Sequence, residues 1–115
     1  MKNWIKKLST DLNLEPTPED WGVMNSDPDR IEEFVDYYEW NKEENKIEDK
    51  GEFETLAELI FNSVEDGFAM GVVDADIKGR LGEFIKEHAE DFPTTLDYWI
   101  SLESPEWKDL TSGLK

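Results

Sequence analysis

Apolar side chains recur along this chain at the spacing of one helix face. Ile31, Phe34, Val35 and Tyr38 follow the i, i+3, i+4, i+7 pattern of an amphipathic helix, whose apolar side faces a core. No stretch of four or more residues alternates convincingly between apolar and polar, which is the pattern of a half-buried strand. The spacing therefore predicts an all-α fold.

Helix start and stop signals divide the chain. A side-chain oxygen followed by proline marks a start at Thr17, Asp27 and Ser104, and Asp74 is a predicted N-cap without proline. Gly71 ends the longest apolar segment. We expect a polar loop over 41–51 and helices over 2–13, 17 to about 22, 27 to 40 or beyond, 52–70, 74 to about 92, 94 or 95 to 102, and 104 to the end.

The predicted helix over 52–70 is the centre of the core, because apolar residues cover well over half of its circumference. A chain of 115 residues is close to the commonest domain size. We therefore predict a single helical domain over 1–115, built as a compact bundle of five to seven helices with short connections.

Acidic residues are concentrated in the first two-thirds of the chain. Residues 15–77 contain 20 acidic and 4 basic side chains, which accounts for almost all of the formal net charge of −17. Such charge opposes the compact state through self-repulsion and attracts basic partners. It argues against direct binding to nucleic acid, which depends on Lys and Arg at the phosphates. The aromatic content of 12% argues against disorder.

The sequence offers little for catalysis, cofactors or membranes. There is no cysteine, so a disulfide, a thiolate metal site and a cysteine nucleophile are excluded. The single histidine, His88, lies on an apolar stripe, where a buried or boundary residue is expected. No apolar run approaches the roughly 20 residues of a membrane span, and Lys6 and Lys7 interrupt any signal-peptide core. We expect a soluble, cytosolic, non-enzymatic protein without a cofactor.

The segment that begins at Asp74 shares part of the pattern of an EF-hand calcium loop. Asp74, Asp76 and Gly79 stand at loop positions 1, 3 and 6. Lys78, however, stands at position 5, and Ile85 stands at position 12, where a bidentate glutamate is required. We therefore predict that Asp74 caps the following helix and binds no calcium.

The outer side of the helix that begins at Asp27 carries an indole among carboxylates. At about 100° per residue, the indole and four carboxylates lie within about 80° of arc opposite the apolar stripe, provided that the helix continues to residue 43. Only Lys42 and Lys46 are near enough in the sequence to offset the charge. We predict a partner-binding surface anchored by Trp40. Its residues are Asp29, Glu33, Asp36, Trp40 and Glu43.

A second acidic stripe lies on the predicted central helix. It consists of Glu54, Glu58 and Glu65, with Phe61 at its border. We predict it as an alternative partner-binding surface, and the sequence does not decide between the two stripes.

The stretch over 34–67 contains Tyr38-Glu39-Trp40-Asn41, a polar loop and the run from Leu56 to Ser63. This stretch resembles small helical proteins of bacterial toxin–immunity loci. The later Leu96-Asp97-Tyr98-Trp99 fits the same resemblance. The resemblance implies a non-enzymatic inhibitor that binds a cognate toxin domain and blocks its active site. Nuclease toxins of such pairs tend to be basic, and an acidic immunity protein would complement them.

Two other hypotheses stay open. An acidic DNA mimic would occupy the DNA groove of a restriction or defence complex, and it would need charges spaced along an extended rod. A helical adaptor domain would need no strong partner. An immunity protein needs one compact patch with a hot-spot aromatic residue, which the cluster around Trp40 favours.

Overall fold

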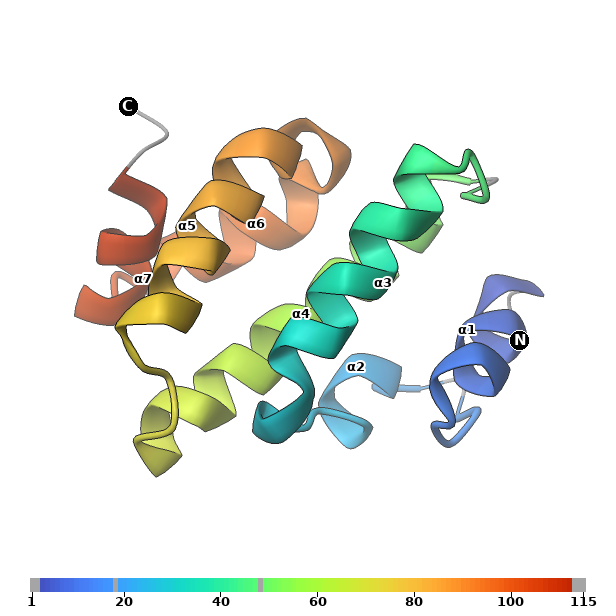
Figure 1. The fold of residues 1–115 in the computed structure, drawn as a ribbon, viewed down its shortest axis with the longest axis horizontal. Helices are drawn as coiled ribbons and strands as arrows, with labels where there is room; N and C mark the ends of the chain where they lie inside the picture. The colour runs from blue at the N-terminus through green and yellow to red at the C-terminus, as the bar shows by residue number, and fades with distance from the viewer. Residues whose placement is uncertain (1–2, 18, 48, 113–115) are drawn as a thin grey trace.

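The computed structural model describes residues 3–17, 19–47 and 49–112 (Figure 1). Within these ranges the chain forms only helices, so the all-α prediction is confirmed. The α-helices are α1 (Asn3–Leu12), α2 (Trp21–Met24), α3 (Ile31–Glu43), α4 (Lys50–Met70), α5 (Ala75–His88), α6 (Pro93–Ser101) and α7 (Pro105–Thr111). Two 3-10 turns, η1 (Pro28–Arg30) and η2 (Ala89–Asp91), join α3 and α5 to their neighbours.

Helix α4 is the centre of the core, as predicted. Helices α2, α3 and α6 pack against it, and α5 packs against α7 (Figure 1). Most of the large apolar side chains that α4 contributes are completely buried, because its apolar residues face neighbours on several sides. They are Leu56, Leu59, Ile60, Phe61 and Val64. Among the residues that the structure describes, no helix combines the length and the apolar character needed to cross a membrane.

Aromatic side chains connect α4 to the C-terminal helices. The ring of Phe61 meets Phe92, Trp99 and Trp107 edge-on, with centroid distances of 5.5, 6.4 and 5.1 Å. Tyr38 of α3 meets Phe92 in the same way at 5.9 Å. Edge-to-face pairs stabilise a core beyond the area that they bury. This aromatic cluster fixes α3, α6 and α7 against α4.

The prediction of a helix start at Thr17 is wrong. Helix α2 begins at Trp21, after Asp20, whose φ of 51° is left-handed and whose side chain caps nothing. Pro18 lies outside the described residues. Trp21 is buried and donates its indole N–H to Ser9 Oγ at 2.8 Å, and a Cβ on Gly22 would lie 3.0 Å from Leu59 N. Packing against α1 and α4, rather than the Thr-Pro signal, sets where this helix lies.

Three other helix signals are confirmed. Asp27 accepts a hydrogen bond from Asp29 N at 3.0 Å, although the first turn that it caps is the 3-10 turn η1. Asp74 accepts from Ile77 N at 2.9 Å and caps α5. Gly71, with a φ of 72°, ends α4 in the left-handed conformation that suits glycine. The predicted loop over 41–51 is shorter than expected, because α3 continues to Glu43 and α4 begins at Lys50.

The start of α6 was predicted incorrectly. The helix begins at Pro93, and neither Thr94 nor Thr95 caps it with its own side chain. Instead, the carboxylate of Glu54, in α4, accepts the backbone N–H groups of Thr94 at 3.1 Å and of Thr95 at 2.8 Å. The helix before it is also shorter than predicted, since α5 ends at His88 and η2 follows. The cap of α6 is thus a tertiary contact.

Candidate partner-binding surface

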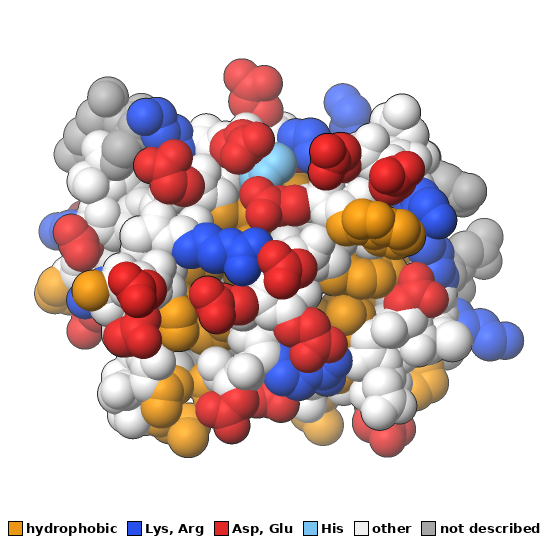
Figure 2. Space-filling view, in the orientation of Figure 1, with side chains coloured by type: hydrophobic (Ala, Val, Ile, Leu, Met, Phe, Trp, Pro, Cys, Tyr) orange, Lys and Arg blue, Asp and Glu red, His pale blue; other side chains and the backbone are white. Residues whose placement is uncertain are grey.

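The predicted outer side of α3 faces solvent. Trp40 is 49% exposed, whereas Phe34 and Tyr38, on the opposite side of the helix, are completely buried. Glu33, Asp36 and Glu43 are exposed on α3, and Asp29 is exposed in η1 just before it. Figure 2 shows this side of the molecule, over α3 and α5, with acidic side chains spread among fewer lysines and arginines. We call it the α3–α5 face, and its residues are Glu33, Asp36, Glu39, Trp40, Glu43 and Glu87.

A lysine of the same chain lies over the exposed indole. Lys46 Nζ is 4.6 Å from the centroid of the Trp40 ring, which is a cation–π contact. Such contacts contribute about 0.5–1 kcal/mol at exposed sites. The indole therefore already binds a cation, from the loop that follows α3.

The expectation that only Lys42 and Lys46 offset the acids of α3 is wrong. Arg30 binds Glu33 with two hydrogen bonds, from Nε to Oε1 at 2.9 Å and from Nη2 to Oε2 at 2.6 Å. These bonds hold the pKa of Glu33 below its usual range, because they favour the charged carboxylate. Arg30 also donates to the backbone oxygen of Leu12 at 2.7 Å, which ties η1 to the end of α1.

Arg80 is a second cation that the sequence reasoning missed. Its guanidinium reaches from α5 to α3, where it donates to Asp36 and, at 3.3 Å, to Glu39. Asp36 is 44 positions away in the chain, so no helical spacing relates the two residues. In the sequence, Arg80 precedes Glu87 by two helical turns, which puts both residues on one side of α5. This spacing indicates that Arg80 lies on an acidic surface, but it does not identify Asp36 as its partner.

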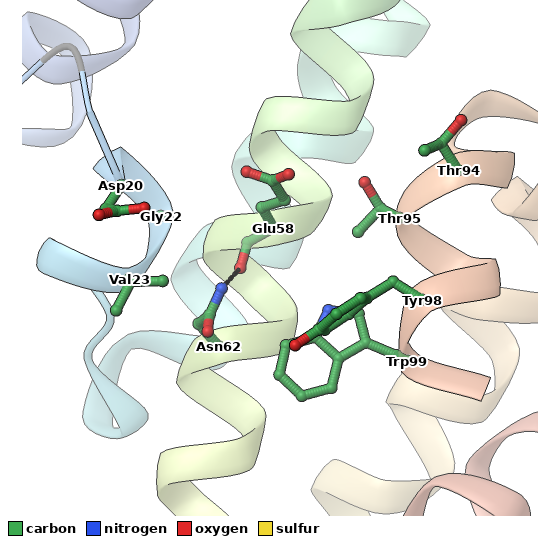
Figure 3. A pocket seen from close by; sticks show the side chains of 9 residues that line it. All are labelled: Asp20, Gly22, Val23, Glu58, Asn62, Thr94, Thr95, Tyr98 and Trp99. Carbon is green, nitrogen blue, oxygen red and sulfur yellow. Dashed lines mark hydrogen bonds between the residues drawn. The ribbon is translucent and has the colours of Figure 1, made fainter. Parts of the chain in front are cut away.

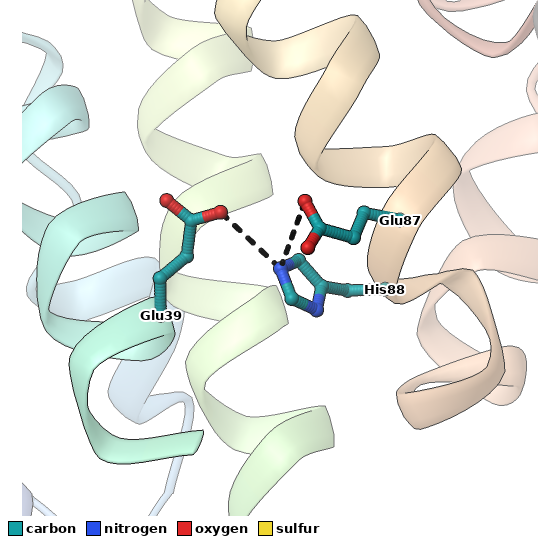
Figure 4. A group of neighbouring side chains, drawn as sticks. All are labelled: Glu39, Glu87 and His88. Carbon is teal, nitrogen blue, oxygen red and sulfur yellow. Dashed lines mark hydrogen bonds and ion pairs between the residues drawn. The ribbon is translucent and has the colours of Figure 1, made fainter. Parts of the chain in front are cut away.

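His88 is buried between α3 and α5, as its place on the apolar stripe predicts. The residue is 5% exposed, and its ring lies against Tyr38 and Phe84 with centroid distances of 5.2 and 5.1 Å. Glu39 and Glu87 flank its Nε2 atom from the two helices (Figure 4).

The hydrogen bonds of His88 define its tautomer. Lys42 Nζ lies 3.1 Å from Nδ1, and an ammonium group can only donate, so Nδ1 accepts. Nε2 therefore carries the hydrogen and donates to Glu39 Oε2 at 3.2 Å. Lys42 also pairs with Asp91 at 2.5 Å, and Tyr38 donates its hydroxyl to the same carboxylate at 2.9 Å. Burial, together with this bond to Asp91, raises the pKa of Tyr38.

Glu39, Glu87 and His88 are close enough to be compared with a metal site, since their ligand atoms lie within 4.8 Å of one another. A metal needs an unprotonated imidazole nitrogen. Here Nε2 carries a hydrogen, Nδ1 accepts from Lys42, and the ammonium group would repel a bound cation. The group is better described as part of a hydrogen-bond network that joins α3 to α5.

The segment compared with a calcium loop is helical, which agrees with the prediction against calcium. Lys78, Gly79 and Ile85 all lie inside α5, and Asp74 uses its carboxylate as the N-cap. No turn of the backbone gathers these positions around an ion.

An open hollow of about 730 Å³ lies on the α3–α5 face. Residues of α3 on both sides of Trp40 in the chain line it, and carboxylates outnumber ammonium groups in its lining. The residues that line it are Glu39, Lys42, Glu43, Glu87 and His88. The face thus combines an exposed indole with a negative depression beside it.

Two of the three carboxylates of the second acidic stripe make hydrogen bonds to other helices of the same chain. Glu54 caps α6, and Glu65 accepts the indole N–H of Trp107 at 2.5 Å. Glu58 is exposed and lines a separate groove between α4 and α6. The structure therefore does not present Glu54, Glu58 and Glu65 as one surface for a partner, whereas it does bring the α3 residues together.

Compared with protein-family models, with curated proteins and with solved structures, the chain matches none.

Proposed function

We propose that this protein is a non-enzymatic acidic binding protein that holds a basic protein partner on the α3–α5 face, in the manner of an immunity protein that neutralises a toxin. The observation that carries the proposal is the half-exposed Trp40 on the helix whose Glu39 and Glu43 line the negative hollow. Tryptophan is enriched among the few residues that dominate binding energy at interfaces. The core side of α3 does not require an indole at this position.

The contact between Lys46 and Trp40 supports a basic partner. It demonstrates that the indole accepts a cation in this surrounding. A lysine or arginine of the partner that displaced Lys46 would form the same contact, and an interface would desolvate it, which strengthens a cation–π interaction. Trp40 would then be the anchor of the interface.

The carboxylates of the face would act mainly on the rate of association. The net charge of −17 creates a long-range field that steers a basic partner. Charges at the rim of an interface change the association rate and its salt dependence more than they change the dissociation rate. Glu43, at the edge of the hollow, is such a charge.

The shape supports an immunity protein over a DNA mimic. The principal extents of 35 × 27 × 24 Å are similar to one another. A mimic of duplex DNA would carry its charges along an elongated body, whereas the carboxylates here surround one aromatic residue. The toxin class that fits this charge is a basic nuclease domain.

The test uses the basic toxin domain that the proposal expects to be encoded beside this protein in its genome. Surface plasmon resonance on the purified pair should show tight binding, and a nuclease assay should show inhibition. Glu43→Lys should lower the association rate and its salt dependence. Trp40→Ala should instead raise the dissociation rate by about tenfold or more.

The matched control is Glu103→Lys, which makes the same charge change at an exposed position between α6 and α7, outside the face. It should lower the association rate less than Glu43→Lys does. A Trp40→Ala protein that folds and inhibits the toxin at full strength would contradict the proposed face. A genome without any basic toxin gene beside this one would contradict the immunity assignment.

A further inference from the structure

A groove of about 370 Å³ lies between α2, α4 and α6, and shares no residue with the α3–α5 face (Figure 3). Val23 of α2 and Tyr98 of α6 form its opposite walls, and both are more than half exposed, at 57% and 58%. Trp99 is buried behind Tyr98, and the two rings meet edge-on at 5.4 Å. Glu58 and Asn62 of α4 form the floor.

Both walls are held against α4 by tertiary contacts. Gly22 brings the backbone of α2 so close to α4 that an added Cβ would lie 3.0 Å from Leu59 N. On the other side, Glu54 accepts the N–H group of Thr95 at the start of α6. Sites built on anchored helices keep their geometry better than sites on loops. The groove is therefore a formed feature of the fold.

The charged groups that line the groove are carboxylates. Glu58 and Asp20 contribute carboxylates, and the described residues that line it include no lysine or arginine. Asn62 donates its amide N–H to the backbone oxygen of Glu58 at 2.7 Å, which leaves the carbonyl oxygen of the amide as an acceptor (Figure 3). The lining thus combines hydrogen-bond acceptors, negative charge and an exposed aromatic ring.

We infer that this groove binds an arginine side chain presented by a partner protein. A guanidinium is planar, stacks on aromatic faces and donates five N–H groups. It can therefore lie against the Tyr98 ring and bind the Glu58 carboxylate at the same time. Its aliphatic stem would lie between Val23 and Tyr98. A lysine would place a compact, strongly hydrated charge there and would use the ring less well. This inference does not depend on the proposed function, because it uses other residues.

The test is a titration of the isotopically labelled full chain with N-acetyl-arginine amide. Binding is measured from the NMR chemical shifts of the backbone amides and the tryptophan indoles. We expect saturable shifts over residues 20–23, 58–62 and 94–99 and at the Trp99 indole. The neutral isostere N-acetyl-citrulline amide should leave these signals unchanged, and N-acetyl-lysine amide should bind more weakly. Equal shifts with citrulline, or tighter binding of free L-arginine than of the capped form, would overturn the inference.

Two variants locate the binding. Tyr98→Ala and Glu58→Gln should each weaken it by about fivefold, and Glu58→Gln keeps the size of the side chain if Tyr98→Ala fails to fold. Asp97→Asn, which removes an exposed carboxylate of α6 outside the groove, should keep the affinity. Shifts centred on Trp40 and Glu43 would refute the groove and leave the proposed α3–α5 interface standing.

Discussion

The carboxylate of Glu54 in α4 accepts the backbone N–H groups of Thr95 at 2.8 Å and of its neighbour Thr94 at 3.1 Å. The first N–H groups of any helix have no partner within the helix. A cap normally comes from the residue just before the helix, but here it comes from 41 positions away. One side chain therefore satisfies the start of α6 and joins α6 to the central helix.

Glu54→Ala should lower the free energy of unfolding by about 1–3 kcal/mol, because it leaves the N–H groups at the start of α6 without their charged acceptor. Glu54→Gln should cost less, since its amide oxygen can still accept. Urea denaturation measures both. Glu83→Ala, at an exposed position of α5, is the control and should change little. Equal stability of the Glu54→Ala and Glu83→Ala proteins would contradict the role of this cap.

Ile60→Ala should cost about 2–5 kcal/mol, because Ile60 is completely buried in α4 and its removal leaves a cavity. Thermal or urea denaturation measures the loss, and circular dichroism should remain helical. Ile100→Ala in α6, where the side chain is 42% exposed, is the matched substitution and should cost less. An unchanged thermal midpoint for Ile60→Ala would contradict the central place of α4.

Trp40→Ala should change the stability by less than about 1 kcal/mol, because the indole is half exposed. Trp107→Ala should cost about 3–5 kcal/mol, since Trp107 is 1% exposed and donates to Glu65. The two urea midpoints, measured side by side, separate a surface indole from a core indole. If Trp40→Ala unfolds the protein, then Trp40 is a structural residue and the proposed interface is wrong.

Raised salt should stabilise this protein modestly, because screening weakens the repulsion among carboxylates. The thermal midpoint should rise between about 10 and 300 mM NaCl, the range in which the Debye length falls well below the size of the protein. Arg80→Gln should steepen this rise, since Asp36 and Glu39 then lose their shared cation. Lys86→Gln, at an exposed position of the same helix, is the control. A wild-type midpoint that stays flat would mean that the ion pairs already balance the repulsion.

Alkaline pH should destabilise the fold through Tyr38. Burial raises the pKa of Tyr38 above the ordinary tyrosine value of about 10, so the folded protein keeps the hydroxyl neutral. The stability linked to this group is therefore present below pH 10 and is lost as the pH rises above it. Phenolate absorbance from Tyr38 should appear only with unfolding, as circular dichroism reports it. Phenolate absorbance that reaches its full tyrosine amplitude while the protein stays folded would contradict this.

Local patterns predicted the fold class and one side of the candidate site. The spacing of Phe34 and Tyr38 predicted which side of α3 is buried, and it thereby predicted that Trp40 is exposed. Asp74 and Gly71 marked a helix start and a helix end correctly. These features succeed because helical periodicity and capping act within one or two turns of the chain.

Local patterns failed where a distant residue decides the outcome. The start of α2 depends on the packing of Trp21 and Gly22 against other helices, and the cap of α6 depends on Glu54. The predicted set of cations that offset the acidic residues of α3 lacks Arg80, because Arg80 reaches Asp36 from α5. No spacing rule relates such residues, since their distance depends on how whole helices pack.

The sequence by itself determined that this chain is helical, that the helix over 52–70 forms its centre, and that an indole lies among carboxylates on an outer surface. Only the tertiary structure decided which carboxylates are available. It paired Asp36 with Arg80, used Glu54 and Glu65 to hold α6 and Trp107, and formed the groove between α2, α4 and α6. The physical reason is that helical periodicity, local caps and local ion pairs depend on neighbouring residues. A cap supplied by another helix, an ion pair between helices or a groove between helices exists only after those helices have packed.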